Sequence, residues 1–246
     1  MIATASRAEF TDAMVADCVG RRSIGAPPPP RLIFDANGHA LSLRETDSSY
    51  RNCVDQADVI HADGGFLVSL SKLMTKTPIA ERSGTTDMIH DFAARAATDG
   101  LSFYLLGGST AVNAECTNRL EAQYPGLSIV GRRDGYFSEE EVGSVIEDIN
   151  RVRPDVLWVG LGKPKEQVFS VKWRDRIDAG WLVTCGGCFN YITGDYARAP
   201  KWMQNNNLEW LHRMVTNPRQ LLWRYLVTTP HALFIALFKS NGKPHG

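Results

Sequence analysis

The sequence has no excess of charge, few cysteines and no long apolar run. Lysine plus arginine and aspartate plus glutamate each number 27 in 246 residues, so the net charge is zero and gives no sign of a nucleic-acid partner. No apolar run reaches the roughly 20 residues of a membrane-spanning helix. The first 30 residues hold no apolar signal-peptide core. The cysteines are odd in number and scattered, which is typical of a reducing cytosol; they are Cys18, Cys53, Cys116, Cys185 and Cys188.

Two ligand-binding motifs are missing as well. No D-x-D triplet occurs, although many metal-dependent sugar-nucleotide transferases hold a divalent cation with that spacing. The stretches "DANGHALSL" and "GLGKPKEQ" do not complete the G-x-G-x-x-G of a dinucleotide-binding turn. We therefore expect no metal ion, and a nicotinamide oxidoreductase is only an alternative.

Charge is distributed unevenly along the chain. Residues 198–246 carry seven Lys or Arg against one acid, Glu209, so this segment is +6 and the remainder is −6. Such asymmetry predicts that the tail meets phosphates or an anionic lipid surface.

Short apolar runs alternate with helical patterns, which predicts an α/β fold with a Rossmann-like parallel sheet and helices on both faces. Thr85–Gly100 has a helix start and a glycine stop, and Ser138 with Glu141 forms a capping box for a second helix. The strand candidates are Leu32–Ala36, Asp58–Ala62, Leu101–Leu106, Leu127–Gly131, Val156–Gly160 and Trp181–Cys185.

Composition divides the chain into three parts. Residues 1–30 form a weakly organised N-terminal extension, with one short helix near Glu9–Val19 and a "PPPP" spacer. Residues 31–197 form the α/β domain, and residues 198–246 form a basic, aromatic helical appendage.

The appendage reads as three short helices, with Pro218 and Pro230 each in the first turn of a helix. Arg213, Arg219 and Arg224 alternate with tryptophan and tyrosine. This combination suits an interface between apolar surface and phosphates.

Glycines follow three of the predicted strands, in "FYLLGGST", "LWVGLGKPKEQ" and "LVTCGGCFN". Glycine lets backbone amides approach a ligand, and a helix N-terminus attracts phosphate, so these exits predict a nucleotide site. Tight turns also contain glycine for structural reasons. The candidates are Gly107, Gly108, Ser109, Gly162 and Pro164.

One acid stands out in "VIHADGGFLVSL". Asp63 follows an apolar strand and precedes two glycines, so it should lie at a mouth or be paired, because an unpaired buried carboxylate is costly. Its role stays open on the residues alone, where a cap for the helix that follows Gly64 is the more common function of such an acid.

Five segments, in this order, resemble the WecG/TagA/CpsF family, glycosyltransferase family 26. They are "HADGGFLVSLSKL", "IAERSGTTDM", "FYLLGGST", "GLGKPKEQ" and "RAPKWMQNNNLEWLHRMVTNPRQLLWRY". The resemblance implies a metal-independent, inverting transferase without a cofactor, which moves a sugar from a UDP-sugar to a polyprenyl-diphosphate-linked saccharide in bacterial surface polysaccharide synthesis. The donor would be N-acetylmannosamine, its uronic acid or glucose. The enzyme would be cytoplasmic and peripheral on an anionic membrane; whether it forms a homo-oligomer stays open.

The resemblance also assigns roles to residues. It implies that Asp63 is the general base and that Asn37 faces the acceptor, although Asn-Gly is also a turn dipeptide. Asn190 departs from the aspartate that is common in relatives, and the order Glu166-Gln167 is reversed, which leaves the assignment between these two open. The further substrate-binding candidates are Arg82, Gly84, Asp87, Lys163, Glu166, Gln167, Arg198, Arg213, Arg219 and Arg224. A non-catalytic membrane-docking module is the alternative from another class.

Overall fold

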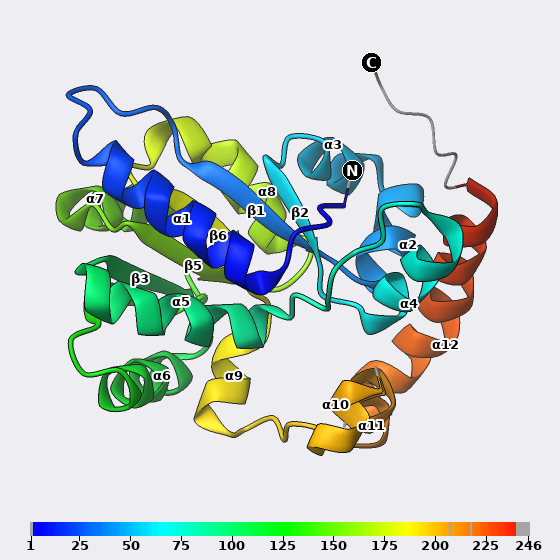
Figure 1. The fold of residues 1–246 in the computed structure, drawn as a ribbon. Coiled ribbons are helices and arrows are strands. Elements are labelled where there is room, and N and C mark those ends of the chain that lie inside the picture. Colours follow the sequence, from blue (N-terminus) through cyan, green and yellow to red (C-terminus); the bar gives the residue numbers. More distant parts are fainter. Residues whose placement is uncertain (1, 207, 217, 240–246) are drawn as a thin grey trace.

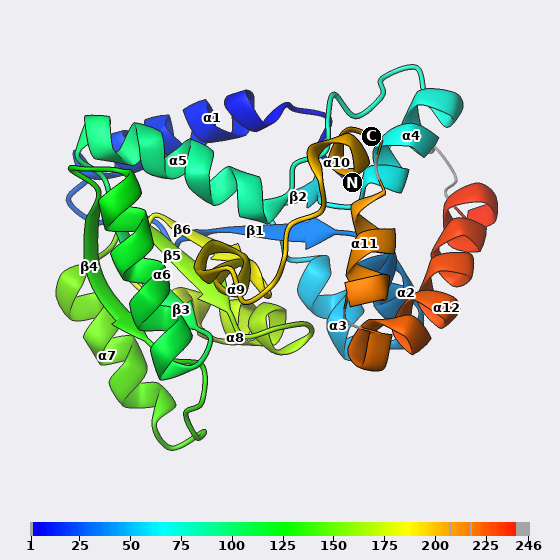
Figure 2. The ribbon, with the colours of Figure 1, turned by 90° about the horizontal axis from the view of Figure 1, so that it is seen from below.

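The computed structural model describes residues 2–206, 208–216 and 218–239, and in this part of the chain six parallel strands form one sheet. Their spatial order is β2-β1-β6-β5-β3-β4, as Figures 1 and 2 show. The predicted strands are confirmed to within two residues at each end. The strands are β1 Arg31–Ala36, β2 Val59–Ala62, β3 Ser102–Gly107, β4 Ser128–Arg133, β5 Val156–Gly160 and β6 Trp181–Thr184.

Helices cover both faces of the sheet, as predicted. Along β5, Trp158 packs in one cluster with side chains of α1, α5 and α6, whereas Leu157 and Val159 pack in another with α7 and α8. Strands buried on both faces read as continuous apolar runs, which is why the sequence pattern was clear. These helices are α1 Arg7–Arg21, α5 Thr85–Asp99, α6 Thr110–Gln123, α7 Val142–Val152 and α8 Lys165–Trp173.

Shorter helices lie around the carboxyl edge of the sheet, at the end of β1 (Figure 2). They are α2 Gly38–Thr46, α3 Ser48–Val54, α4 Gly65–Met74 and α9 Cys188–Thr193. A single 3-10 turn, Arg174–Arg176, follows α8.

The predicted helix limits are confirmed for α5 but not for α7. Gly100 ends α5 with φ +66°, in the left-handed region that favours glycine. Helix α7 begins at Val142, because residues 139–141 form a turn. Only half of the expected capping box is present: the backbone N–H of Ser138 donates to Glu141 Oε2 at 2.8 Å.

The N-terminal segment is better organised than the sequence predicts. Helix α1 is 15 residues long and starts with a complete capping box between Ser6 and Glu9. Phe10, Met14 and Cys18 are buried in the core cluster on the face of α5. The division of the chain at residues 30 and 197 stays a prediction.

The tail forms α10 Lys201–Asn205, α11 Glu209–Thr216, α12 Pro218–Phe234 and a π-helical turn Ile235–Lys239. The prediction that Pro230 starts a third helix is wrong, since Pro230 lies inside α12. Packing on α2 keeps this stretch helical: Ser42 Oγ lies 2.9 Å from His231 Nδ1, and Ala232 is fully buried near Gly38.

One described helix, Leu221–Lys239, is long and apolar enough to cross a membrane by length and composition. The sequence prediction concerned an uninterrupted apolar run, and Arg224, Pro230 and His231 interrupt this helix, so that prediction is not contradicted. Length and composition alone do not distinguish a spanning helix from one that lies on a membrane surface.

Candidate functional site

A cavity of about 510 Å³ lies at the carboxyl edge of the sheet, where sheets of this kind bind ligands. The ends of β1, β2, β5 and β6 form its floor, the beginning of α5 forms a wall, and the tail covers it. The lining residues are Asp35, Asn37, Gly38, His39, Asp63, Gly64, Gly65, Phe66, Arg82, Thr85, Thr86, Gly162, Lys163, Glu166, Cys185, Gly186, Gly187, Cys188, Tyr191, Gln204, Glu209, Trp210, Arg213, Thr229 and Leu233.

The ends of β1 and β2 bring two carboxylates and an amide together. Ala36 pairs with Ala62 in the parallel register, so Asn37 and Asp63 leave the sheet side by side. Asn37 Nδ2 donates to Asp35 Oδ2 at 2.9 Å and to Asp63 Oδ2 at 3.4 Å. Asn37 Oδ1 accepts from a backbone N–H of α2, so this residue caps a helix and lines the cavity at once.

Asp63 does not cap a helix. Gly64 is the N-cap of α4, and no side chain caps that helix. The backbone N–H groups of Asp63 and Gly64 both donate to the carbonyl of Ala36, at 2.9 and 3.0 Å, and these bonds fix the turn. The carboxylate therefore faces the cavity instead of the helix that follows.

The surroundings of Asp63 keep its carboxylate ionised. Burial alone would raise the pKa of Asp63, but the positive charges of Arg213 and Arg82 lower it below the ordinary value. Arg82 Nη1 lies 4.0 Å from Asp63 Oδ1. An ionised carboxylate at the mouth of a cavity can accept a proton from a bound hydroxyl group.

A buried ion pair lies beneath this group. Lys163, after β5, donates to both carboxylate oxygens of Asp35, and the two side chains are 10% and 6% exposed. Burial would lower the pKa of Lys163, but the neighbouring carboxylate of Asp35 raises it overall, so the ammonium stays charged. Asp35 thus balances the charge of Lys163 at the cavity floor.

The structure shows which of Glu166 and Gln167 lines the cavity. Glu166 is fully buried beside the cavity, and its Oε2 accepts from the backbone N–H groups of Gly162 at 2.9 Å and Gly186 at 3.0 Å. Burial raises the pKa of Glu166 to about 7, against the opposing charge of Lys163. Glu166 therefore ties two glycine exits together, whereas Gln167 is buried outside the cavity lining.

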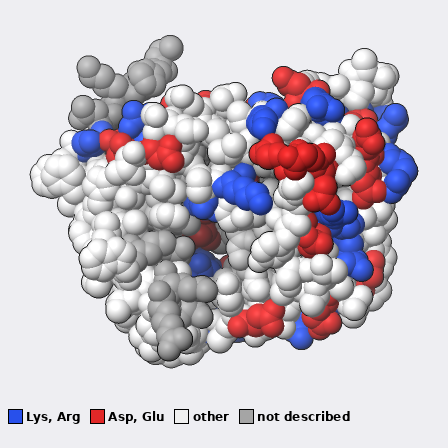
Figure 3. All heavy atoms as spheres, turned by 180° about the vertical axis from the view of Figure 1, so that it is seen from behind, with Lys and Arg blue, Asp and Glu red and all other residues white. Residues whose placement is uncertain are grey.

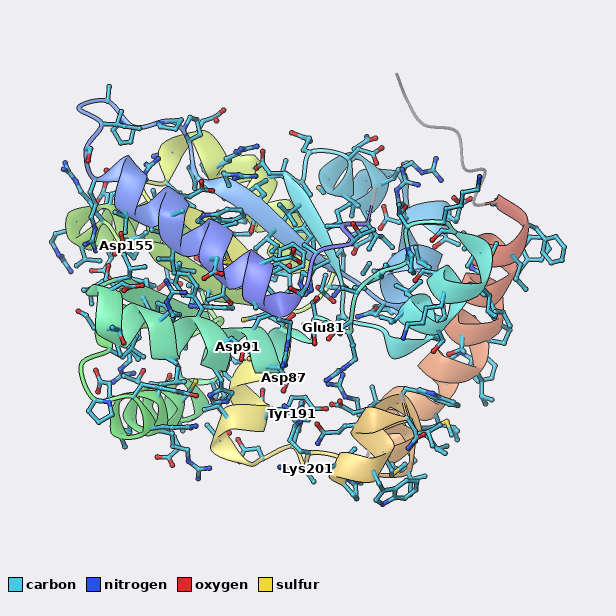
Figure 4. The ribbon with its side chains drawn as sticks, viewed as in Figure 1. Glu81, Asp87, Asp91, Asp155, Tyr191 and Lys201 are labelled. Carbon is cyan, nitrogen blue, oxygen red and sulfur yellow. The ribbon has the colours of Figure 1, made fainter. Side chains whose placement is uncertain are left out.

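Three arginines meet around one acid of the tail. Glu209, only 6% exposed, lies 3.1 Å from Arg82, 3.2 Å from Arg213 and 3.9 Å from Arg198. Asp87 accepts from Arg82 at 2.8 Å and from Arg198 at 2.9 Å. Figure 4 shows Asp87 at the beginning of α5, on the side of the domain that faces α10 and α11. These ion pairs connect the tail to the α/β domain and place guanidinium groups at the cavity.

Several other predicted residues, all of them described, fall outside the cavity lining. Gly84 is the N-cap of α5, Pro164 precedes α8, and Ser109 caps α6 with its side chain. A Cβ on Gly107 would lie 2.2 Å from the carbonyl oxygen of Gly160, so this glycine has a structural reason. Gly108, in the left-handed region, packs near Val112. The side chains of Arg219 and Arg224, on α12, lie outside the described residues.

Sequence reasoning missed several lining residues, above all Asp35, Glu209 and Tyr191. Asp35 looks like an interior strand residue, and its partner Lys163 is 128 positions away. Glu209 carried a signal, because it is the only acid among the basic residues of the tail. Tyr191, on α9, lies under Arg213, whose Cζ is 4.6 Å from the centre of the tyrosine ring.

Within the described ranges, no group of three or more His, Cys, Asp or Glu side chains is placed to hold a metal ion. Asp35 accepts from Lys163 and Asn37, and Asp63 accepts from Asn37. The expectation of a metal-independent reaction stays a prediction.

A family model and two relatives of known activity match this chain. The sequence model of the "Glycosyl transferase WecG/TagA/CpsF family" matches residues 4–245. The N-acetylglucosaminyldiphosphoundecaprenol N-acetyl-beta-D-mannosaminyltransferase of Bacillus spizizenii is 30% identical over 198 residues, which cover 80% of this chain and 75% of that protein. The enzyme of the same name from Bacillus subtilis is 28% identical with the same coverage.

Proposed function

The chain belongs to the WecG/TagA/CpsF glycosyltransferase family, and from this premise we propose that it transfers N-acetylmannosamine from UDP to a polyprenyl-diphosphate-linked N-acetylglucosamine. That the protein is a glycosyltransferase acting on a lipid-linked sugar in cell-envelope polymer synthesis follows from its family and its relatives. The UDP carrier and the identity of the sugar are the proposal. The uronic acid of N-acetylmannosamine and glucose are the other donors to be tested.

The ionised carboxylate of Asp63 supports this proposal most strongly. In the proposed reaction, Asp63 takes the proton of the acceptor hydroxyl group as its oxygen attacks the anomeric carbon of the donor. The bond from that carbon to the diphosphate breaks, UDP leaves, and the configuration is inverted. Asn37, which bonds to Asp63 Oδ2, holds the carboxylate in position.

The arginines supply the charge that the leaving group needs. A diphosphate gains negative charge as the bond breaks, and guanidinium groups fit phosphate oxygens in pairs. Arg82 and Arg213 line the cavity on the side of Asp63. Asp87 pairs with Arg82, and Glu209 pairs with both Arg82 and Arg213, so a bound diphosphate would replace part of an existing carboxylate environment.

The experiment is a panel of UDP-sugars with a short-chain polyprenyl-diphosphate N-acetylglucosamine, read by mass spectrometry. We expect one product whose mass increases by an N-acetylhexosamine and whose new linkage is inverted. A product with retained configuration, or no transfer from any UDP-sugar in the panel, would contradict the proposal.

We further propose that the tail docks on the cytoplasmic face of an anionic membrane, where a polyprenyl-linked acceptor resides. Trp223 is 76% exposed and Phe238 is 70% exposed, and both belong to the basic tail. Aromatic side chains favour the membrane interface, and basic residues are attracted to anionic lipid. Trp223→Gln and Phe238→Gln should reduce binding to anionic vesicles. Release of the native protein from membranes by alkaline carbonate would distinguish peripheral docking from a spanning helix.

A further inference from the structure

A second exposed apolar feature lies outside the tail, at the end of α4. We define the α4 tip as residues Lys72–Lys76. Leu73 is 85% exposed, more than any other large apolar side chain in the described part of the chain, and Met74 is 44% exposed. Both lysines are exposed, and no acidic residue occurs between Gly64 and Ala80.

The α4 tip cannot bury these side chains against its own domain. The opposite side of α4 is already packed, with Leu67 and Val68 in a cluster that includes Ile79. Ser71 Oγ accepts from the backbone N–H of Ile79 at 3.0 Å and fixes the segment that follows the helix. Leu73 therefore points away from the core as a consequence of helix geometry.

The α4 tip lies at the same end of the molecule as α12 in two perpendicular views (Figures 1 and 2). The beginning of α4 and the end of α12 both line the cavity, through Phe66 and Leu233. Seen from behind, charged side chains at the end that carries α12 gather at its upper edge and the rest of its described surface there is mostly uncharged, whereas the opposite end is densely charged (Figure 3). Apolar residues are also exposed on α12; they are Leu226, Val227, Leu233 and Phe234.

We propose that the α4 tip is a second membrane contact, which inserts Leu73 and Met74 into an anionic bilayer and places Lys72 and Lys76 at lipid phosphates. The positive charge without a neighbouring acid favours anionic lipid over a second copy of this neutral chain. This inference rests on the proposed function, because it adds to the proposed docking of α12.

The test measures binding of the full chain to vesicles of phosphatidylglycerol and phosphatidylcholine, and to vesicles of phosphatidylcholine alone. Since each lysine near an anionic surface changes binding by about fivefold, Lys72→Gln with Lys76→Gln should weaken binding to the anionic vesicles roughly 25-fold. Leu73→Gln should weaken it about tenfold.

Matched controls remove two positive charges, and one exposed apolar side chain, at positions outside the α4 tip. Arg151→Gln with Lys172→Gln takes two charges from exposed positions on α7 and α8, and Tyr136→Gln changes a side chain that is 82% exposed. These variants should bind anionic vesicles within about twofold of the native chain, as expected when a charge lies beyond the Debye length from the surface. Equal losses in the control pair and the tip pair would show a net-charge effect and overturn the proposal.

A second readout separates this inference from the proposed function. All tip variants should turn over a water-soluble, short-chain acceptor at the native rate. The membrane contact would be overturned if the tip variants bound vesicles as tightly as the native chain. It would also be overturned if they kept vesicle binding but lost self-association in sedimentation velocity. A loss of soluble turnover would also overturn it, by assigning the tip to the fold or the site. If the native chain transfers no sugar to the soluble acceptor, the proposed function fails instead.

Discussion

Replacing Glu209 by glutamine should loosen the tail and change how the protein responds to UDP. Among the described residues, Glu209 is the one acid that contacts Arg82, Arg198 and Arg213 together, and its side chain is 8% exposed. Removing one partner of a buried ion pair typically costs about 3–5 kcal/mol, because a charge is left without its partner. Arg82 and Arg198 keep Asp87, so we expect the lower end, about 3 kcal/mol.

For a chain of this size, about 3 kcal/mol corresponds to a fall in Tm of roughly 6–12 °C. The assay is thermal unfolding with and without UDP. If a bound diphosphate restores the negative charge around Arg82 and Arg213, UDP should raise the Tm of Glu209→Gln more than it raises the Tm of the native protein.

The matched control is Glu115→Gln, which removes an exposed helix-surface ion pair with Arg119 and should shift Tm by about 2 °C or less. If Glu209→Gln shifts Tm no more than this control, the arginine cluster does not hold the tail. If it loses stability and also responds less to UDP, the arginines are not the diphosphate-binding groups.

Three further predictions concern the cavity floor and the chemistry. Glu166 has a folded pKa of about 7, above its unfolded value of 4.5, so its contribution to stability is present below pH 4.5 and is lost as pH rises toward 7. The Tm of Glu166→Gln should therefore rise relative to that of the native protein as the pH is raised from 5 to 7. A difference in Tm that does not depend on pH would contradict this reasoning. Asp35→Asn should destabilise the protein by about 3 kcal/mol in urea unfolding, because the buried Lys163 ammonium loses its carboxylate, and adding Lys163→Met should recover part of that loss; additive effects would show that the pair is not coupled. Transfer should survive exhaustive EDTA treatment, and recovery of a dead enzyme by Mg²⁺ or Mn²⁺ would exclude the metal-independent mechanism.

The sheet could be predicted because its strands are buried on both faces and are punctuated by helices with clear ends. Val156–Gly160, for example, is fully apolar in sequence and fully buried in the structure. The position of Asp63 followed from the end of β2, where the parallel register places it beside Asn37. Local pattern and global structure agree at these positions.

The tail and the partners of the site could not be predicted in the same way. Pro230 is a helix-start signal by itself, and only the distant contact of Ala232 with α2 explains why α12 continues through it. Asp35 and Lys163 are likewise joined only by the fold. The glycines after β3 look like ligand contacts in sequence, but Gly107 is required by the close approach of Gly160.

The measurement that tests the central claim most directly is sugar transfer by Asp63→Asn, with UDP affinity and Tm measured on the same preparation. Asparagine keeps the size of the side chain but cannot take up the proton, so transfer should fall by about 10²–10⁴, the usual contribution of a general base. UDP affinity should stay at the native level or increase, because the negative charge beside Arg82 and Arg213 is removed. Near-native transfer by a folded Asp63→Asn protein would contradict the assignment of Asp63 as the base.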